Sequence, residues 1–352
     1  MNFIEFLKRF FWGNKLSQKA LPEIVEKAAL PPVKKDVWVL SIDGGGIRGI
    51  IPSFVIEKLE ETLEKKGGEA NIASYFDLIA GTSTGALIAL ALAKKNPLNA
   101  SEITELYLHK NNIFFPPAKG FLERLLKEKY STTPIEEYLD EMYKNDTFES
   151  LTTDTLILSY DIENANVFPM SKTITPDFPL KAALRASTAA PTFYKPMHTN
   201  YKEKDYSLID GGVYANNPVI WAYSEAKKLF KDTGKIHILS LGNFRKKPVF
   251  NTDSGSFSWL DITKGNLPIY SLYHTAGQDS AEYLAKSIKD LDYIRIEYSS
   301  NKEEAIKMDD TSAFTLNRLS VMGKTVIEEN NKLIDNIADK LITHKKSKLK
   351  FS

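Results

Sequence analysis

The stretch Ser41-Ile-Asp-Gly-Gly-Gly-Ile-Arg-Gly-Ile50 directly follows the apolar run Val37-Trp38-Val39-Leu40. An apolar run that ends in a glycine-rich turn is typical of a buried strand leading into a helix. Gly44, Gly46 and Gly49 also satisfy the GxGxxG spacing of dinucleotide-binding folds, in which the loop binds a pyrophosphate. The same backbone N–H groups could instead bind the oxyanion of a reaction intermediate. The rest of the chain decides between the two anions.

A second glycine motif, Gly81-Thr-Ser-Thr-Gly85, lies between an expected strand over residues 76–80 and an apolar helix over residues 86–95. GxSxG between a strand and a helix is the pattern of a nucleophile elbow. Such a turn would present the Ser83 hydroxyl at a helix N-terminus, where the helix dipole favours an alkoxide. Because glycine- and serine-rich turns also occur by chance, the motif alone makes Ser83 only a candidate nucleophile.

A third motif, Asp210-Gly211-Gly212, follows the expected strand over residues 206–209. It can be a simple strand-to-loop turn, since Asp-Gly is favoured in turns. It can also place a carboxylate at the end of a strand, with glycines that let other backbone approach closely. The sequence of this motif alone leaves both interpretations open.

The dinucleotide interpretation requires an acidic residue about 20 residues after the glycines, at the end of the second strand. That region is instead expected to be helical, with Glu60, Glu61 and Glu64, and the second strand ends in the GxSxG motif. A cofactor site would also leave Ser83 and Asp210 without a role. An oxyanion hole explains all three motifs together, and we therefore expect the first loop to bind an oxyanion.

Strands that alternate with helices predict an α/β fold with a central, mainly parallel sheet. Further strands are expected at 155–160 and 236–241, and a final helix at about 312–342. We divide the chain into an N-terminal amphipathic helix and linker (1–36), a catalytic domain (37–342) and a basic tail (343–352).

The composition excludes several functional classes. The 352 residues carry 46 basic and 45 acidic side chains, so net charge gives no reason to expect a nucleic-acid partner. Cysteine is absent, which excludes disulfides and thiolate metal sites. No apolar run reaches the roughly 18–20 residues of a membrane span, and no secretory signal is evident. We expect a cytoplasmic protein.

The N-terminal sequence MNFIEFLKRFFW places five apolar side chains on one helical stripe: Phe3, Phe6, Leu7, Phe10 and Phe11. Such a helix can lie at a membrane surface, which would make residues 1–14 a peripheral membrane contact. It can also pack on the body of the protein. Both possibilities stay open.

Together these motifs resemble the patatin-like phospholipase family, whose pattern is DGGG[IL][RK]G, then GxSxG, then DG[GA]. The chain has them in that order, at Asp43–Gly49, Gly81–Gly85 and Asp210–Gly212. Supporting blocks match at Arg185–Pro191, Asn216–Pro218, Ser240–Gly242 and Met308–Ser312, so that the resemblance spans about residues 37–340. Plant patatins usually continue Ser-Leu-Gly with Thr-Gly, whereas this chain has Asn243. We expect that difference to concern a structural loop and to leave the chemistry undisturbed.

The resemblance implies a three-layer α/β fold and a lipid acyl hydrolase that uses a Ser-Asp dyad, without calcium, metal or cofactor. Ser83 would be the nucleophile and Asp210 the proton acceptor, while Gly44, Gly45, Gly46 and Thr84 would supply oxyanion N–H groups. Residues of the supporting motif would be Asp43, Arg48, Gly49, Gly81, Gly85, Gly211 and Gly212. Arg48 would shape the loop, with binding of a lipid head group as its alternative role.

The substrates would be phospholipids, lysophospholipids or galactolipids of membranes. An aspartate with the usual pKa of about 3.9 is a weak base at neutral pH, so the dyad requires burial that raises the pKa of Asp210. Two alternatives remain. One is an α/β-hydrolase esterase with a Ser-His-Asp triad, for which none of the five histidines lies in a glycine-framed motif. The other is a non-catalytic lipid-binding protein on the same scaffold.

Overall fold

The computed structural model describes residues 35–117, 128–231, 233–245, 268–300 and 306–349. The expected N-terminal helix with its apolar stripe, most of the linker, and residues 350–352 of the basic tail lie outside these residues.

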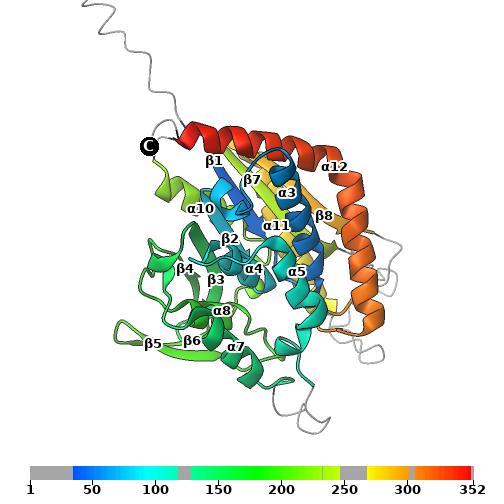
Figure 1. Ribbon diagram of the computed structural model, residues 1–352. Helices are drawn as coiled ribbons and strands as arrows, with labels where there is room; N and C mark the ends of the chain where they lie inside the picture. The colour runs from blue at the N-terminus through cyan, green and yellow to red at the C-terminus, as the bar shows by residue number, and fades with distance from the viewer. Residues whose placement is uncertain (1–34, 118–127, 232, 246–267, 301–305, 350–352) are drawn as a thin grey trace, which may run out of the picture. The chain divides into compact units, whose positions relative to one another are not determined.

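A mixed β-sheet with the strand order β5-β6-β3-β2-β1-β7-β8 forms the centre of the described chain (Figure 1). Strands β3, β2, β1, β7 and β8 run parallel to one another in that spatial order. Strands β4 and β6 pair antiparallel with β3, and β5 pairs antiparallel with β6. The strands are β1 (Val37–Ile42), β2 (Leu78–Thr82), β3 (Asp154–Asp161), β4 (Asn166–Met170), β5 (Met197–Tyr201), β6 (Lys204–Asp210), β7 (Ile236–Arg245) and β8 (Leu291–Ser299).

Strand β1 lies between β2 and β7, and all of its residues are buried. A parallel strand covered on both faces is apolar throughout, because its alternate side chains point to opposite faces and each face is buried in a core. Trp38, Leu40 and Ile42 face one core, whereas Val37 and Val39 face the other. The uninterrupted apolar run before the first glycine loop is thus explained by its central position.

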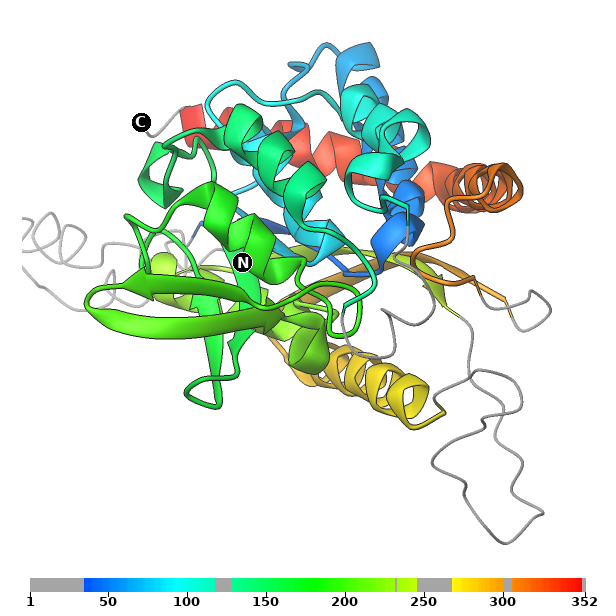
Figure 2. The same ribbon diagram turned by 90° about the horizontal axis from the view of Figure 1, so that it is seen from below.

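Helices cover both faces of the sheet, which gives the expected three layers (Figure 2). One face carries α3 (Ile50–Lys65), α4 (Thr84–Ala93), α5 (Ala100–His109), α7 (Thr133–Tyr143), α8 (Leu180–Ser187) and α12 (Ala313–Leu349). The other carries α9 (Gly212–Ala215), α10 (Val219–Leu229) and α11 (Pro268–Ser287). Short 3₁₀ helices are η1 (Gly46–Gly49), η2 (Ile72–Tyr75), η3 (Asn111–Ile113) and η4 (Phe148–Ser150). The α/β fold class is confirmed.

Helix α4 is buried at every position, which explains its apolar sequence. Among the helices that the structure describes, none is both long and apolar enough to span a bilayer.

Several elements differ from the expectations, among them strands β4 and β5, which the sequence did not predict. The second strand begins at Leu78 and not at residue 76, because the Asp77 carboxylate accepts the Trp38 N–H at 2.8 Å. Strand β8 was not expected, since charged residues interrupt its apolar pattern. Arg295 and Glu297 in that strand are not solvated but belong to an ion network described below.

The final helix continues to Leu349, beyond its expected end at about residue 342. Its last turns are fixed by a hydrogen bond and ion pairs with the body of the protein. His344 Nε2 lies 2.8 Å and Lys348 Nζ 2.7 Å from the Asp77 carboxylate, and Lys345 Nζ lies 2.6 Å from Glu69. The first part of the basic tail is therefore a docked helix and not a separate segment.

Replacing Asp77 with alanine should lower the free energy of unfolding by about 1.5–3 kcal/mol, the range for hydrogen bonds to charged groups. Burial raises the pKa of Asp77, but His344 and Lys348 bring it below its ordinary value. Because the folded-state pKa is depressed, this stabilisation is complete above about pH 3.9 and disappears as the pH falls further. Urea unfolding of both proteins at pH 7 and pH 3 measures the effect. An equal difference at the two pH values would contradict the ionic role of Asp77.

Candidate active site

Ser83 lies on a sharp turn between β2, which ends at Thr82, and α4, which begins at Thr84. Its backbone has φ 56° and ψ −121°, a region that non-glycine residues rarely adopt. The Ser83 N–H donates to Ser187 Oγ at 2.9 Å, and that hydroxyl donates to the Leu158 carbonyl at 2.7 Å. This strained, supported strand–turn–helix has the geometry of a nucleophile elbow.

The two glycines of this motif are required by close backbone contacts. A Cβ on Gly81 would lie 2.3 Å from the Gly85 carbonyl oxygen, and a Cβ on Gly85 would lie 2.2 Å from the Ile42 carbonyl oxygen. Either contact is far inside van der Waals distance with backbone that cannot move away easily. The start of α4 is therefore packed directly on the carboxyl end of β1, next to the first glycine loop.

Asp210 is the last residue of β6 and pairs with Ser159 of β3 in the sheet. Its side chain is buried and hydrogen-bonds with the Ser83 side chain, while its Oδ1 accepts the Gly212 N–H at 2.7 Å. Burial raises the pKa of Asp210 to about 6, and the two hydrogen bonds limit the increase. The sheet thus brings together two motifs that lie far apart in the sequence.

The first glycine loop lies beside the elbow. A Cβ on Gly44 would lie 3.1 Å from the Ser83 Cβ. The backbone of Gly44 therefore lies so close to Ser83 that a side chain at this position would be crowded. Gly46 has φ +61° and contacts the Met308 carbonyl, which also accepts the Ile47 N–H at 2.8 Å. Glycine is needed at Gly46 both for this conformation and for the contact.

The backbone N–H groups of this region differ in availability. The Gly44 N–H donates to the Asn216 carbonyl at 3.0 Å, and so it does not point freely at a ligand as the sequence suggested. Within the described part of the chain, the N–H groups of Gly45, Gly46 and Thr84 have no hydrogen-bond partner. These three remain candidate oxyanion donors.

Two further motif residues support the loop. The Arg48 Nε donates to the Gly45 carbonyl at 3.0 Å, which agrees with a role in shaping the loop. A Cβ on Gly49 would lie 2.6 Å from Thr84 Oγ1 and 2.8 Å from the Tyr107 hydroxyl, which hydrogen-bonds to Thr84. The loop, the elbow and α5 therefore fix one another.

The Asp43 carboxylate is fully buried and anchors the loop to β8. Arg295 binds it with two parallel hydrogen bonds of 2.9 and 2.6 Å, and also donates to Ser240 Oγ at 2.8 Å. Glu297 accepts from Arg295 at 2.7 Å and from Arg245 at 3.1 Å, so charges alternate along the network. Burial disfavours ionised Arg295, but Asp43 and Glu297 hold its pKa above its ordinary value. Burial also raises the pKa of Asp43, and Arg295 opposes that rise, so the two parallel hydrogen bonds favour the ionic form of the pair.

A largely apolar pocket begins at Ser83 and encloses about 530 Å³ of space free of protein atoms, part of it open to solvent. Besides Gly46, Ser83 and Thr84, its lining consists of Leu87, Tyr107, Phe114, Phe115, Ile135, Thr188, Ala190, Phe193, Tyr194 and Met308. Such a lining suits an acyl chain better than a charged cofactor. The sequence placed Thr188, Ala190 and Met308 in motif blocks and Leu87 in an apolar helix, but it gave no indication that these residues line one pocket.

Among the residues that the structure describes, no histidine lines this pocket. His237 lies between Asp292 and Asp36, at 2.7 and 3.3 Å, and stacks on Trp38 at the opposite end of β1 from the glycine loop. His109, His198 and His344 pair with Glu105, Ser207 and Asp77. The side chain of His274 lies outside what the structure describes.

Asn216 and Asn243 are site residues whose roles the sequence did not reveal. Asn243 was expected in a structural loop that leaves the chemistry undisturbed, but it lies in β7 and its amide donates to the Gly44 carbonyl at 2.7 Å. The sequence shows that Asn243 follows the Ser-Leu-Gly motif. It cannot show that the Asn243 side chain hydrogen-bonds to the Gly44 carbonyl, because the two residues lie 199 positions apart.

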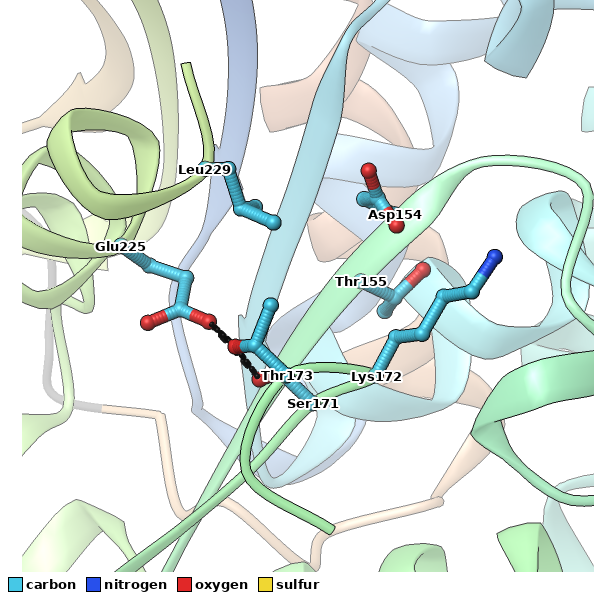
Figure 3. Close-up of a pocket in the computed structure, with 7 residues that line it drawn as sticks. All are labelled: Asp154, Thr155, Ser171, Lys172, Thr173, Glu225 and Leu229. Atoms are coloured by element: carbon cyan, nitrogen blue, oxygen red, sulfur yellow. Dashed lines mark hydrogen bonds between the residues drawn. The ribbon is translucent and has the colours of Figure 1, made fainter. Parts of the chain in front are cut away.

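A second, smaller pocket lies away from Ser83, between β3, the segment after β4, and α10 (Figure 3). Glu225 points into it, and its carboxylate accepts hydrogen bonds from Ser171 Oγ, at 2.8 Å, and from Thr173. Because local hydroxyls satisfy this buried carboxylate, we assign it a structural role. No group of three or more metal-binding side chains occurs among the described residues.

A family model and similar curated proteins point to the same family. Residues 40–223 match the family described as patatin-like phospholipase. Patatin-like protein 2 of Oryza sativa subsp. indica is 30% identical over 87% of this chain and 87% of its own length. Patatin-like protein 2 of Arabidopsis thaliana is 32% identical, over 82% of this chain and 81% of its own.

Two solved structures align with the chain at low similarity. VipD from Legionella pneumophila has a TM-score of 0.39 and 13% identity, covering 90% of this chain and 67% of VipD. The type III effector protein ExoU has a TM-score of 0.36 and 12% identity, covering 87% of this chain and 54% of ExoU.

Replacing Arg295 with methionine should lower the free energy of unfolding by about 3–5 kcal/mol, because it leaves the Asp43 carboxylate buried without its partner. The matched control is Lys181→Met, which removes an exposed pair with Asp140 and should cost less than about 1 kcal/mol. Chemical denaturation of the three proteins gives both values. Similar small losses in both variants would show that the network does not anchor the loop.

Proposed function

Since the chain belongs to the patatin-like phospholipase family, we propose that it cleaves fatty-acyl esters through a Ser83–Asp210 dyad. Family membership makes it a lipid hydrolase. The finer proposal covers phospholipids, lysophospholipids and galactolipids as substrates. The observation that supports it most is a serine on a strained turn, hydrogen-bonded to a buried aspartate of raised pKa, at one end of an apolar pocket.

In the proposed acylation, Ser83 Oγ attacks the ester carbonyl carbon and Asp210 accepts its proton. The carbonyl π electrons move to the oxygen, and this oxyanion accepts hydrogen bonds from the N–H groups of Gly45, Gly46 and Thr84. When the intermediate collapses, the bond to the leaving alkoxide breaks and Asp210 returns the proton to it. The products of this step are an alcohol, such as a lysolipid, and an acyl-Ser83 enzyme.

Deacylation repeats the sequence with water as the nucleophile. Asp210 accepts a proton from water, the hydroxide adds to the acyl carbon, and the proton returns to Ser83 Oγ as the fatty acid leaves. The raised pKa suits this cycle, because a general base is most effective when its pKa lies near the operating pH. The apolar lining would bind the acyl chain, which also keeps water from the far side of the reacting carbonyl.

We propose that the reaction is independent of calcium. The positive electrostatic potential at the oxyanion would come from the three backbone N–H groups and from the N-terminus of α4. Peripheral contact of residues 1–14 with a membrane is part of the same proposal, because the substrates reside in bilayers.

Replacing Ser83 with alanine or Asp210 with asparagine should each reduce ester hydrolysis by at least about 10³-fold, while the melting temperature stays close to that of the wild type. Because the two residues act as one unit, the double variant should be barely slower than either single variant. Release of fatty acid from mixed micelles in excess EDTA measures the activity.

Three outcomes would contradict this assignment. Additive losses in the double variant would mean that the two residues act separately. An activity lost in EDTA and restored by calcium would contradict calcium independence. A large loss in His274→Ala would favour the Ser-His-Asp triad.

The pH dependence of kcat/KM provides an independent test. Asp210 accepts a proton only when ionised, so activity should fall as the pH is lowered, with a midpoint at about pH 6. Hydrolysis of a soluble short-chain ester between pH 4 and 8 gives this profile without changes in lipid ionisation. A midpoint near pH 4 would show that Asp210 keeps an ordinary pKa and that burial does not tune the base.

A further inference from the structure

We propose that Asn216 and Asn243 are positioning residues that orient the Gly45 N–H toward the oxyanion, acting through the Gly44–Gly45 peptide. The proposal rests on the hydrolase function above. Neither side chain would touch the substrate. Each would act by binding the opposite end of the peptide that carries the donor.

The two side-chain amides meet at one acceptor. The Gly44 carbonyl oxygen accepts the Asn216 Nδ2 at 3.0 Å and the Asn243 Nδ2 at 2.7 Å. A carbonyl oxygen has two lone pairs, and both are used here. On its other side, the Gly44 N–H donates to the Asn216 backbone carbonyl at 3.0 Å. Gly44 is therefore held at both of its polar groups.

Peptide planarity transmits this restraint to the next residue. The Gly44 C=O and the Gly45 N–H belong to one planar trans peptide, in which they point in opposite directions. Since the carbonyl is directed at the two amides, the Gly45 N–H must point away from them. That N–H has no partner among the described residues, and a Cβ on Gly44 would contact the Ser83 Cβ. The restrained peptide thus lies beside the nucleophile with its donor free.

Burial makes the alternative orientation costly. Asn216 and Asn243 are 8% and 5% exposed, so turning the Gly44 carbonyl away would leave two nearly buried amides unsatisfied. Each buried, unsatisfied donor costs free energy that folding does not recover. Gly45 packs directly on one of them, since a Cβ there would lie 2.3 Å from Asn243 Nδ2. A glycine loop that is intrinsically mobile is therefore held in one orientation before substrate binds.

Asn216 also links the donor to the base. It follows Asp210 by six residues on the same segment, across the short helix α9. The Ala215 carbonyl accepts the Thr82 hydroxyl at 2.8 Å, which ties this segment to the elbow. The Gly45 N–H, Asp210 and Ser83 are therefore all linked to the segment 210–216.

The test compares Asn243→Leu and Asn243→Asp with the wild type. Leucine removes the amide without adding charge, whereas the aspartate carboxylate would repel the Gly44 carbonyl. Loss of one oxyanion donor costs about 10²–10³ in kcat. Since Asn216 still binds the peptide, we expect kcat on a short soluble ester to fall about 10- to 100-fold, more in the aspartate variant, with KM within about twofold.

The readout that separates positioning from a general structural defect is inhibition by two ligands with the same acyl chain. A trifluoromethyl ketone forms a bond from Ser83 Oγ to its carbonyl carbon, its oxygen becomes an anion, and the proton passes to Asp210. Its Ki should rise by the same factor by which kcat falls. The corresponding alcohol forms no oxyanion, and its Ki should not change.

Asn200→Leu is the matched control, because it removes an exposed side-chain amide in the edge strand β5 that donates to Asp205 Oδ1 at 2.8 Å. It should retain wild-type kinetics. An unchanged ketone Ki in folded Asn243→Leu, or equal changes for ketone and alcohol, would overturn the positioning role. A wild type without Ser83-dependent hydrolysis would instead reject the proposed function itself.

Discussion

The close packing of two glycine turns at the carboxyl ends of β1 and β2 is the constraint on which the site depends. Gly85 lies directly on the Ile42 carbonyl, and Gly44 lies against Ser83. Any side chain at either glycine would separate the elbow from the loop. Because β1 is the buried central strand, this contact is fixed by the core and does not rely on surface loops. The turn at Ser83 can therefore be strained without being mobile.

Buried polar groups next to the first glycine loop also fix its position and orientation. The buried Asp43–Arg295 pair fixes where the loop leaves β1, and the amides of Asn216 and Asn243 fix how its first peptide is turned. An ion pair of this kind adds little net stability but is costly to break, since it would leave a buried charge. Such groups hold the loop in one conformation and disfavour others, and a site that binds a short-lived oxyanion requires donors that are already oriented.

The fold and the three motifs could be predicted because each depends on local sequence. Apolar runs predict buried strands, and glycines mark the turns around Ser83 and Asp210. Strand β8 escaped prediction because its charges satisfy one another only in the folded protein. Arg295 and Asp43 lie 252 residues apart, so no local pattern pairs them. For the same reason the sequence could name Gly44 as a donor but could not show that its N–H is already bound by Asn216.

The central claim is that Ser83 becomes covalently acylated during turnover. The most direct measurement mixes the protein with an activated fatty-acyl ester, stops the reaction with acid within milliseconds to seconds, and locates the added mass by peptide mass spectrometry. The account predicts one acyl group, on the peptide that contains Ser83, in the wild type and none in Ser83→Ala. An acyl group on another residue, or rapid ester turnover in Ser83→Ala, would contradict it.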